Sequence, residues 1–263
     1  MKIMYLNPLG IPDYNQTFAD MARDYKSPGN SVTVTSLNSS VGLMDNLEYR
    51  VYEALVWSDT LKAARQASIE GYDALVIGCF YDPVLEDCRQ IAGKSGMIVV
   101  GPCQASIETA LRLGNTYSVI IGQWQWKDQM METIRKYGYD HQLASFRSIG
   151  MSVPEMVANP AEAEARILAE SQAAVDEDKA EVIVLGCTLE IGFFRTVQAS
   201  IGVPVIDPSI AALKSAEAAG DIRVRAGWGT STRWGMEAPS DADMARFQIL
   251  QTPYVFGGRV EVP

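Results

Sequence analysis

The chain has 263 residues, of which 48% are hydrophobic and 21% are charged, a composition typical of a folded protein with one or two domains. It carries 22 Lys and Arg against 32 Asp and Glu, and the resulting net charge of −10 argues against binding to nucleic acids or anionic lipids. No apolar segment approaches the roughly 18 residues of a membrane span, and the first apolar run ends at Asn7-Pro8, too early for a signal peptide. We therefore expect a cytoplasmic protein.

The four cysteines are too few for a disulfide scaffold in a chain of this length. They contain no C-x-x-C pair, and the single histidine, His141, has no cysteine near it in sequence, so the spacing predicts no metal site. One histidine also argues against Ser-His-Asp and Cys-His catalysis. Cys88 and Cys103 are expected to pack in the core, although a place at the edge of a pocket stays open for Cys103.

Taken in chain order, strands and helices alternate. Short apolar runs that end at turn residues predict strands at Lys2–Leu6, Ser31–Ser36, Ala74–Gly78, Met97–Val100, Thr116–Ile121, Leu143–Ser148, Glu181–Gly186 and Val203–Ile206. Helical spacing lies between them, at Glu48–Ile69, Pro83–Ile91, Ser106–Leu113, Lys127–Tyr137, Glu162–Asp176, Phe193–Ile201 and Ser209–Ala219. This alternation predicts an α/β fold with parallel sheets that are covered by helices on both faces.

The second half of the chain repeats the first. The run YDALVIGC, which ends at Cys79, resembles AEVIVLGC, which ends at Cys187. A proline that opens an Ala-rich helix follows 23 residues after the first cysteine, at Pro102, and 21 residues after the second, at Pro208. Chance similarity between two Val/Ile-rich strands is the simpler alternative, but the match continues over more than twenty residues and favours a true repeat.

The repeat predicts two pseudo-symmetric lobes, each a parallel sheet flanked by helices, with the active site in the cleft between them. We expect residues 1–113 and about 210–263 in the first lobe and residues 114–209 in the second. The helices after the two prolines are expected to end at Gly114 and Gly220. Residues after about Asp221 match neither repeat, and the sequence leaves open whether they wrap the first lobe, form a subunit contact or cover the cleft.

Cys79 and Cys187 each follow a buried strand and precede a predicted helix. Ligands of parallel sheets bind beyond the carboxyl ends of the strands, so two facing lobes would bring these thiols to opposite walls of one cleft. Asp82-Pro83 and Thr188 are expected to begin the two helices, and a helix N-terminus lowers a thiol pKa and stabilises anions. Either cysteine alone suits a buried core position, whereas their equivalence in the repeat favours an acid/base pair.

At these residues the chain resembles the aspartate/glutamate racemase superfamily and, within it, the hydantoin racemase branch. The motifs that carry the resemblance are Asn7-Pro8 after the first strand, GCFYDP around Cys79 and GCTLE around Cys187, and the similarity covers roughly residues 1–219. The resemblance implies an isomerase without metal or cofactor, in which one cysteine removes a proton from the stereogenic carbon and the other returns one on the opposite face. It also implies a homo-oligomer.

Carried over by position, Cys79 and Cys187 would be the catalytic pair. The same resemblance implies that Asn7, Phe80 and Thr188 bind a carboxylate or imide oxygen of the substrate through side-chain or backbone groups.

Several candidate residues depart from the family pattern. Tyr81 stands where the branch usually has Gly and would crowd the mouth of the site, and Gln123 lies in a loop that usually offers hydroxyl groups. Glu190 could orient a substrate amine or simply occupy the positive end of a helix. We count these three among the expected substrate-binding residues. Trp124 and Trp126 alternate, which predicts one exposed and one buried ring, with packing as the expected role and a pocket wall as the alternative.

The expected function is a cofactor-independent racemase or epimerase for a small carboxylate, amino acid or hydantoin-type substrate. Each sulfur should approach the reacting carbon to about 3–4 Å, which places the two sulfurs about 6–8 Å apart. One alternative is a maleate cis–trans isomerase with one cysteine as a covalent nucleophile; a decarboxylase of the arylmalonate type, which keeps only the second cysteine, is disfavoured. The other alternative is a protein that binds a small anion without catalysis.

Overall fold

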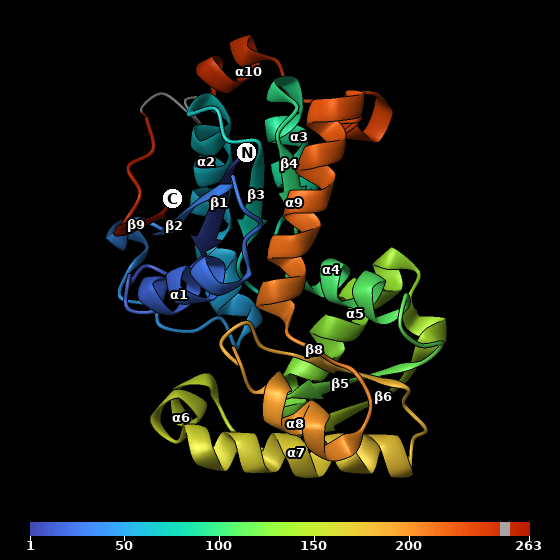
Figure 1. Cartoon of the computed structure of the whole chain (residues 1–263). Helices are drawn as coiled ribbons and strands as arrows, with labels where there is room; N and C mark the ends of the chain where they lie inside the picture. The colour runs from blue at the N-terminus through green and yellow to red at the C-terminus, as the bar shows by residue number, and fades with distance from the viewer. Residues whose placement is uncertain (248–252) are drawn as a thin grey trace.

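The computed structural model describes residues 1–247 and 253–263, and these form two sheets that lie in different parts of the molecule (Figure 1). The first sheet has the strand order β4-β3-β1-β2-β9. Its strands are β1 (Lys2–Asn7), β2 (Ser31–Ser36), β3 (Ala74–Ile77), β4 (Ile98–Val100) and β9 (Arg259–Val262). Neighbouring strands in this sheet run parallel, except that β9 runs antiparallel to β2.

The second sheet is parallel throughout and has the order β6-β5-β7-β8. Its strands are β5 (Tyr117–Ile121), β6 (Leu143–Ser148), β7 (Val182–Leu185) and β8 (Val205–Ile206). The first strand of each half, β1 or β5, lies in the middle of its sheet beside the strand that leads to a cysteine, β3 or β7. The eight strands predicted from the sequence are confirmed within about two residues, and the α/β class with them.

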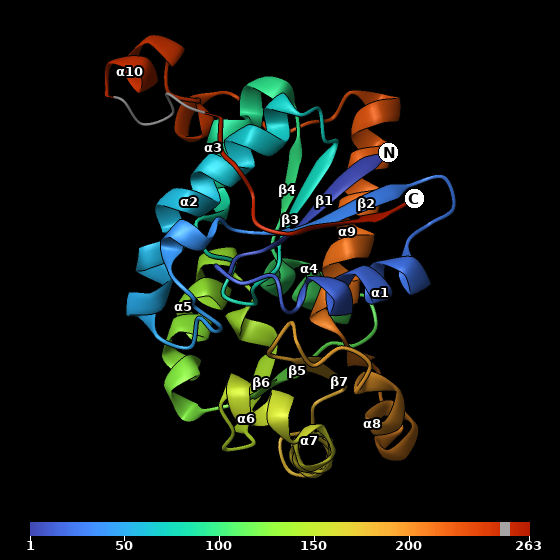
Figure 2. The same ribbon diagram turned by 90° about the vertical axis from the view of Figure 1, so that its left-hand side faces the viewer.

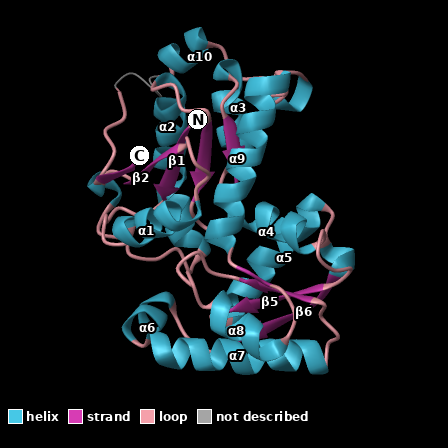
Figure 3. Cartoon of the chain, viewed as in Figure 1, coloured by secondary structure: helices cyan, strands magenta, loops and turns pink. Residues whose placement is uncertain are grey.

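Helices surround both sheets (Figures 2 and 3). The seven predicted helices are found as α2 (Arg50–Ile69), α3 (Leu85–Ala92), α4 (Pro102–Ala110), α5 (Lys127–Tyr137), α7 (Pro160–Asp176), α8 (Phe194–Ile201) and α9 (Pro208–Ala226). The described residues also form three α-helices that were not predicted, namely α1 (Asn15–Tyr25), α6 (Val153–Ala158) and α10 (Asp241–Arg246). The buried residues of α1 include Phe18, Met21 and Ala22, so its apolar face has helical spacing that the sequence analysis did not use.

The hydrophobic core is continuous between the two halves. One cluster of buried side chains includes Val76 of β3, Val184 of β7 and Leu213 of α9. The helix α4 connects the sheets because it packs against α9 on one side and against β7 and β8 on the other. A second cluster, with Val56 of α2 and Leu75 of β3, fills the other face of the first sheet. The cleft between the halves is thus bordered by packed elements on both sides.

The segment after Pro208 differs from the prediction. The helix α9 does not end at Gly220 but continues to Ala226, and Gly220 lies inside it, where a Cβ would come within 3.0 Å of the Met1 sulfur. Gly220 therefore allows α9 to pack closely against Met1. The corresponding helix α4 ends at Ala110, four residues before Gly114.

The C-terminal segment wraps the first lobe. Its last strand, β9, extends the first sheet at β2, and the Tyr254 hydroxyl accepts a hydrogen bond of 2.7 Å from the backbone N–H of Asn38. Residues 248–252 of the stretch that we assigned to this lobe lie outside the described residues. The boundaries near residues 113 and 210 stay a proposal, which the pairing within two separate sheets supports. Among the described residues, no helix combines the length and apolar character needed to cross a lipid bilayer.

Candidate active site

A glycine separates each of the two strands β3 and β7 from its cysteine, and the structure explains why. The N–H of Gly78 donates to the carbonyl of Leu6 at 2.7 Å, and the N–H of Gly186 donates to the carbonyl of Ile120 at 2.8 Å. A Cβ on Gly78 would lie 2.8 Å from that Leu6 oxygen, and a Cβ on Gly186 would lie 2.5 Å from the Ile120 oxygen. Any side chain would push the following cysteine away from the central strand, so the two Gly-Cys pairs are sterically equivalent.

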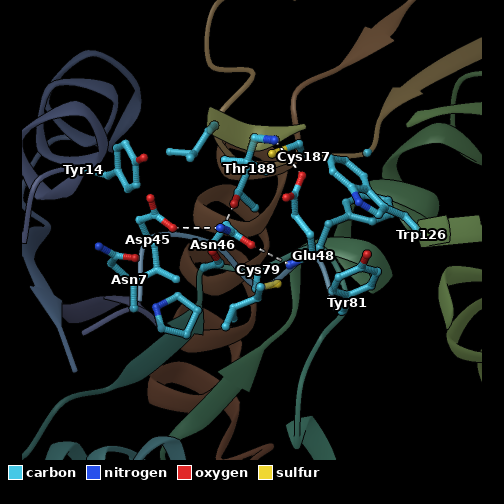
Figure 4. A pocket seen from close by; sticks show the side chains of 18 of the residues that line it. Asn7, Tyr14, Asp45, Asn46, Glu48, Cys79, Tyr81, Trp126, Cys187 and Thr188 are labelled. Atoms are coloured by element: carbon cyan, nitrogen blue, oxygen red, sulfur yellow. Dashed lines mark hydrogen bonds between the residues drawn. The ribbon is translucent and has the colours of Figure 1, made fainter. Parts of the chain in front are cut away.

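The two cysteines meet at one pocket between the lobes (Figure 4). This pocket contains about 540 Å³ of empty space, part of it open to solvent, and both Cys79 and Cys187 line it. Cys79 is partly exposed, and Cys187 keeps 8% of its surface exposed. The other two cysteines, Cys88 and Cys103, are fully buried and do not line the pocket.

Four of the six predicted substrate-binding residues line the same pocket: Asn7, Phe80, Tyr81 and Thr188. The other two do not. Gln123 lies outside the lining, and Glu190 is buried beneath the second cysteine with 1% of its surface exposed. Because its Oε2 accepts from the N–H of Cys187 at 3.3 Å, Glu190 holds the cysteine loop instead of facing the pocket.

Asn7 and Thr188 are already engaged within the protein. The Asn7 amide donates to the Ile11 carbonyl at 3.2 Å and to the Asn15 side chain at 3.1 Å. The Thr188 hydroxyl donates to the Gly78 carbonyl at 3.0 Å and so joins the two cysteine loops directly. Thr188 therefore fixes the position of one loop relative to the other, in addition to lining the pocket.

The segment 45–48 forms another wall of the pocket and was not predicted from the sequence. It precedes α2, and the Glu48 carboxylate accepts a hydrogen bond of 2.6 Å from the N–H of Val153 at the start of α6. A second contact between the halves joins Gln129 of α5 to Glu53 of α2. No strand end marks residues 45–48, and their place depends on how the two lobes pack, so the sequence offered no local signal for them.

The pair Trp124 and Trp126 behaves as the alternation predicts. Trp124 is 59% exposed, and Trp126 is 3% exposed and lines the pocket. The pocket wall that the sequence analysis held as an alternative is thus the position that Trp126 occupies. Its buried indole N–H and the buried phenol oxygen of Tyr81 have no hydrogen-bond partner in the described part of the chain.

The expected placement of the thiols at helix N-termini is wrong. After Cys79 the chain passes through two residues with positive φ, Asp82 at 52° and Val84 at 46°, and α3 begins only at Leu85. After Cys187 the helix α8 begins only at Phe194. The carboxylate of Asp82 does cap a helix, but it caps α4 by accepting from the N–H groups of Cys103 and Gln104, each at 2.9 Å.

The environment of the thiols also differs from the expected one. Burial raises the pKa of Cys79 well above its usual range, and the nearby Glu53 carboxylate raises it further. Burial and Glu190 likewise raise the pKa of Cys187. A backbone N–H near each sulfur, that of Tyr81 at Cys79 and that of Leu189 at Cys187, acts in the opposite direction and lowers the thiol pKa. Burial therefore favours the protonated thiol at both positions, whereas the nearby backbone N–H groups favour the anion.

A sequence model of the Asp/Glu/Hydantoin racemase family matches residues 3–216. A hydantoin racemase from Rhizobium meliloti is 36% identical over 166 residues, which are 63% of this chain and 68% of the relative. A hydantoin racemase from Paenarthrobacter aurescens is 29% identical over 242 residues, covering 92% of this chain and 98% of the relative.

The fold has a solved counterpart. An allantoin racemase from Klebsiella pneumoniae superposes with a TM-score of 0.81 at 23% identity, over 92% of this chain and 94% of that one. The expectation of an isomerase of the racemase type is confirmed by these matches. The family match spans both cysteine loops and the strands β1 to β8, and the chain therefore belongs to the Asp/Glu/hydantoin racemase family.

Proposed function

We propose that this protein racemises 5-substituted hydantoins, with Cys79 and Cys187 as the acid/base pair. The observation that carries the proposal is that these two thiols, and neither of the other two cysteines, line one pocket between the lobes. The names of the relatives point to the same class of cyclic ureide. The other predictions for this protein, a homo-oligomer in the cytoplasm without cofactor, stay predictions.

The charge of the pocket favours a neutral substrate over a carboxylate. Asp45 and Glu48 line it, whereas no Lys, Arg or His is found among the described residues that do. Transferring a carboxylate into such a site would leave it without a cation and next to two acids, which is costly. A hydantoin is uncharged and presents N–H donors, so it suits these walls. The same argument disfavours maleate isomerisation, amino-acid racemisation and simple binding of an anion.

The reaction uses the two sulfurs in turn. The thiolate of one cysteine takes the proton from C5 of the hydantoin, and the electron pair of the broken C–H bond moves onto the oxygen of the adjacent carbonyl. The thiol of the other cysteine then gives its proton to C5 on the opposite face, and it becomes the thiolate for the reverse direction. The backbone N–H groups of Tyr81 and Leu189, which lower the pKa of Cys79 and Cys187 respectively, favour whichever thiolate is present.

The test is racemisation of one enantiomer of 5-methylhydantoin in D₂O, followed by polarimetry and mass spectrometry. We expect Cys79→Ala and Cys187→Ala each to lower the racemisation rate by at least about 10³-fold, as expected for loss of a positioned acid or base. Deuterium incorporation with retention of configuration should persist in at least one of them. The matched control is Cys88→Ala, which removes a buried thiol outside the pocket.

Two results would oppose the proposal. Racemisation within tenfold of the parent rate in either single variant would exclude the thiol pair. Turnover of maleate, with a mass increase on one cysteine, would instead identify a cis–trans isomerase.

A further inference from the structure

One side of the pocket carries polar groups that the two-thiol reaction does not yet use. Tyr81 is 7% exposed and Trp126 is 3% exposed, and in the described residues neither the phenol oxygen nor the indole nitrogen has a hydrogen-bond partner. Both residues line the pocket, and Figure 4 draws them on the same side of it as Glu48. Leaving a buried donor without a partner costs about 1–3 kcal/mol, so two such groups at one cavity indicate a ligand that completes them.

These groups lie close to the reacting centre. Tyr81 follows Cys79 by two residues, and both line the same pocket as Cys187 and Trp126. Burial is the main reason that the pKa of Tyr81 is raised, so the phenol keeps its proton and is a donor. The indole N–H of Trp126 can only donate. Two side chains with unpartnered donors therefore line the pocket that also holds both thiols.

Glu48 provides the complementary acceptor. Its Oε1 accepts from the N–H of Val153, which fixes the carboxylate across the cleft. A carboxylate has about four lone-pair sites, so this bond leaves capacity for a donor from a ligand. Two donors and one acceptor on the same wall are complementary to a carbonyl next to an N–H group.

We propose that Tyr81 and Trp126 donate hydrogen bonds to the hydantoin carbonyl adjacent to the reacting carbon, and that Glu48 accepts from the neighbouring ring N–H. The inference rests on the proposed function and adds the groups that receive the charge. When C5 loses its proton to a thiolate, the electron pair moves onto this carbonyl oxygen, where the phenol and indole donors stabilise it. When the second thiol returns a proton to C5, the carbonyl re-forms. Donors placed where charge develops commonly contribute about 10²–10³-fold to kcat.

The kinetic test uses Tyr81→Phe and Trp126→Phe with two substrates, 5-methylhydantoin and allantoin, which carries a ureido group at C5. We expect each variant to lower kcat by about 10²-fold on both substrates, because both share the ring carbonyl. The matched controls are Trp124→Phe, in the same loop but exposed, and Tyr139→Phe, whose hydroxyl bonds Glu108 away from the pocket. They should stay within twofold of the parent. A loss confined to allantoin, or no loss on either substrate, would overturn the proposal.

A binding test separates this inference from the proposed function. The ligand 5,5-dimethylhydantoin has no C5 proton and cannot be racemised, but it keeps the ring carbonyl and N–H. We expect calorimetry to give at least tenfold weaker binding to Tyr81→Phe, and a similar loss when the ligand is methylated at the ring N–H between the carbonyls. In Glu48→Gln the preference for the unmethylated ligand should shrink. Equal binding in all these pairs would overturn the proposed hydrogen bonds from Tyr81 and to Glu48. Binding without racemisation by the parent protein would overturn only the proposed function.

Discussion

The two cysteine loops follow the same backbone path with different side chains. Three residues after each cysteine, the N–H of Asp82 bonds the Cys79 carbonyl at 3.1 Å and the N–H of Glu190 bonds the Cys187 carbonyl at 3.2 Å. Three residues further, the equivalent pairs are Leu85 to Asp82 at 3.3 Å and Phe193 to Glu190 at 3.4 Å. The geometry that presents each sulfur is thus common to both loops.

The two loops differ in the sequence position of the carboxylate that links the loop to the N-terminus of a helix, α4 in the first lobe and α9 in the second. In the first lobe the acid is Asp82 on the loop, and the residue before the helix α4 is Gly101. In the second lobe the acid is Asp207, the residue before α9, and its Oδ2 accepts from the N–H of Gly192 on the loop at 3.0 Å. Asp82 also accepts from N–H groups in the first turn of α4, and Asp207 accepts from N–H groups in the first turn of α9.

The difference shows that the site requires a carboxylate at a particular point in space and not at a particular position in the sequence. A Cβ on Gly101 would lie 2.3 Å from the carboxyl carbon of Asp82, so the loop acid occupies the volume that a capping side chain would fill. Gly101 and Asp82 therefore depend on each other sterically. A residue-by-residue comparison of the two halves does not reveal that the two carboxylates have equivalent positions.

The largest predicted effect comes from disturbing the pair of Gly101 and Asp82. Gly101→Asp alone places a second carboxylate against Asp82 and should lower the free energy of unfolding by about 3 kcal/mol. Asp82→Ala alone removes the cap and should cost about 2 kcal/mol. The double variant recreates the arrangement of the second lobe and should be more stable than Gly101→Asp. Chemical denaturation measures all three.

The double-variant cycle gives a clear criterion. A favourable coupling of at least about 1 kcal/mol between the two substitutions is expected, because each removes the penalty of the other. Strict additivity would show that the carboxylates of the two lobes do not play equivalent parts. Racemisation by the double variant would show in addition that Cys79 has returned to its position.

A smaller effect distinguishes Glu190 from Asp82 by pH. Burial raises the pKa of Glu190 from its usual 4.5 to about 8, so the folded protein retains this proton over a range in which the unfolded chain has lost it. Its contribution to stability is present below about pH 4.5 and is lost as the pH rises to about 8. Glu190→Gln keeps the neutral shape, and we expect its Tm to equal that of the parent near pH 5 and to exceed it by several degrees at pH 9.

Asp82→Asn is the counterpart of that substitution. An amide can offer only one oxygen to the donors that Asp82 satisfies, so this variant should be less stable than the parent at low pH. Burial raises the pKa of Asp82 to about 6, so the difference should narrow as the pH rises from about 4 to 6, a lower range than that over which Glu190 loses its contribution. Glu237→Gln, at an exposed position, serves as the control for removal of a charge. A Glu190→Gln variant whose Tm falls with pH as steeply as that of the parent would contradict the assignment.

Much of the fold followed from the sequence because its signals are local. The apolar strands end at turn residues, and the two Gly-Cys pairs follow the strands beside the centre of each sheet, so the shared pocket could be predicted from the repeat. The strand β9 was missed because it is short and partly exposed, and because its partner β2 lies more than 200 residues earlier. The helix starts were misplaced because Asp82-Pro83 has the composition of a helix cap, whereas the backbone turns left-handed at Asp82.

The smallest predicted effect concerns a position where the loops share a conformation but not a residue. Five residues after its cysteine, each loop has a residue with positive φ, Val84 at 46° in the first and Gly192 at 88° in the second. Glycine adopts this region freely, whereas a β-branched side chain is strained there. Gly192→Ala should lower the free energy of unfolding by about 1 kcal/mol, and conformation is the main cause because nothing lies within 4 Å of the added Cβ.

Val84→Gly should relieve a similar strain, but it also loses side-chain packing and increases the conformational entropy of the unfolded chain, so its net effect should stay within about 1 kcal/mol. Denaturation curves of both variants measure the two costs, and a Gly192→Ala protein as stable as the parent would show that this loop can leave the left-handed conformation without penalty.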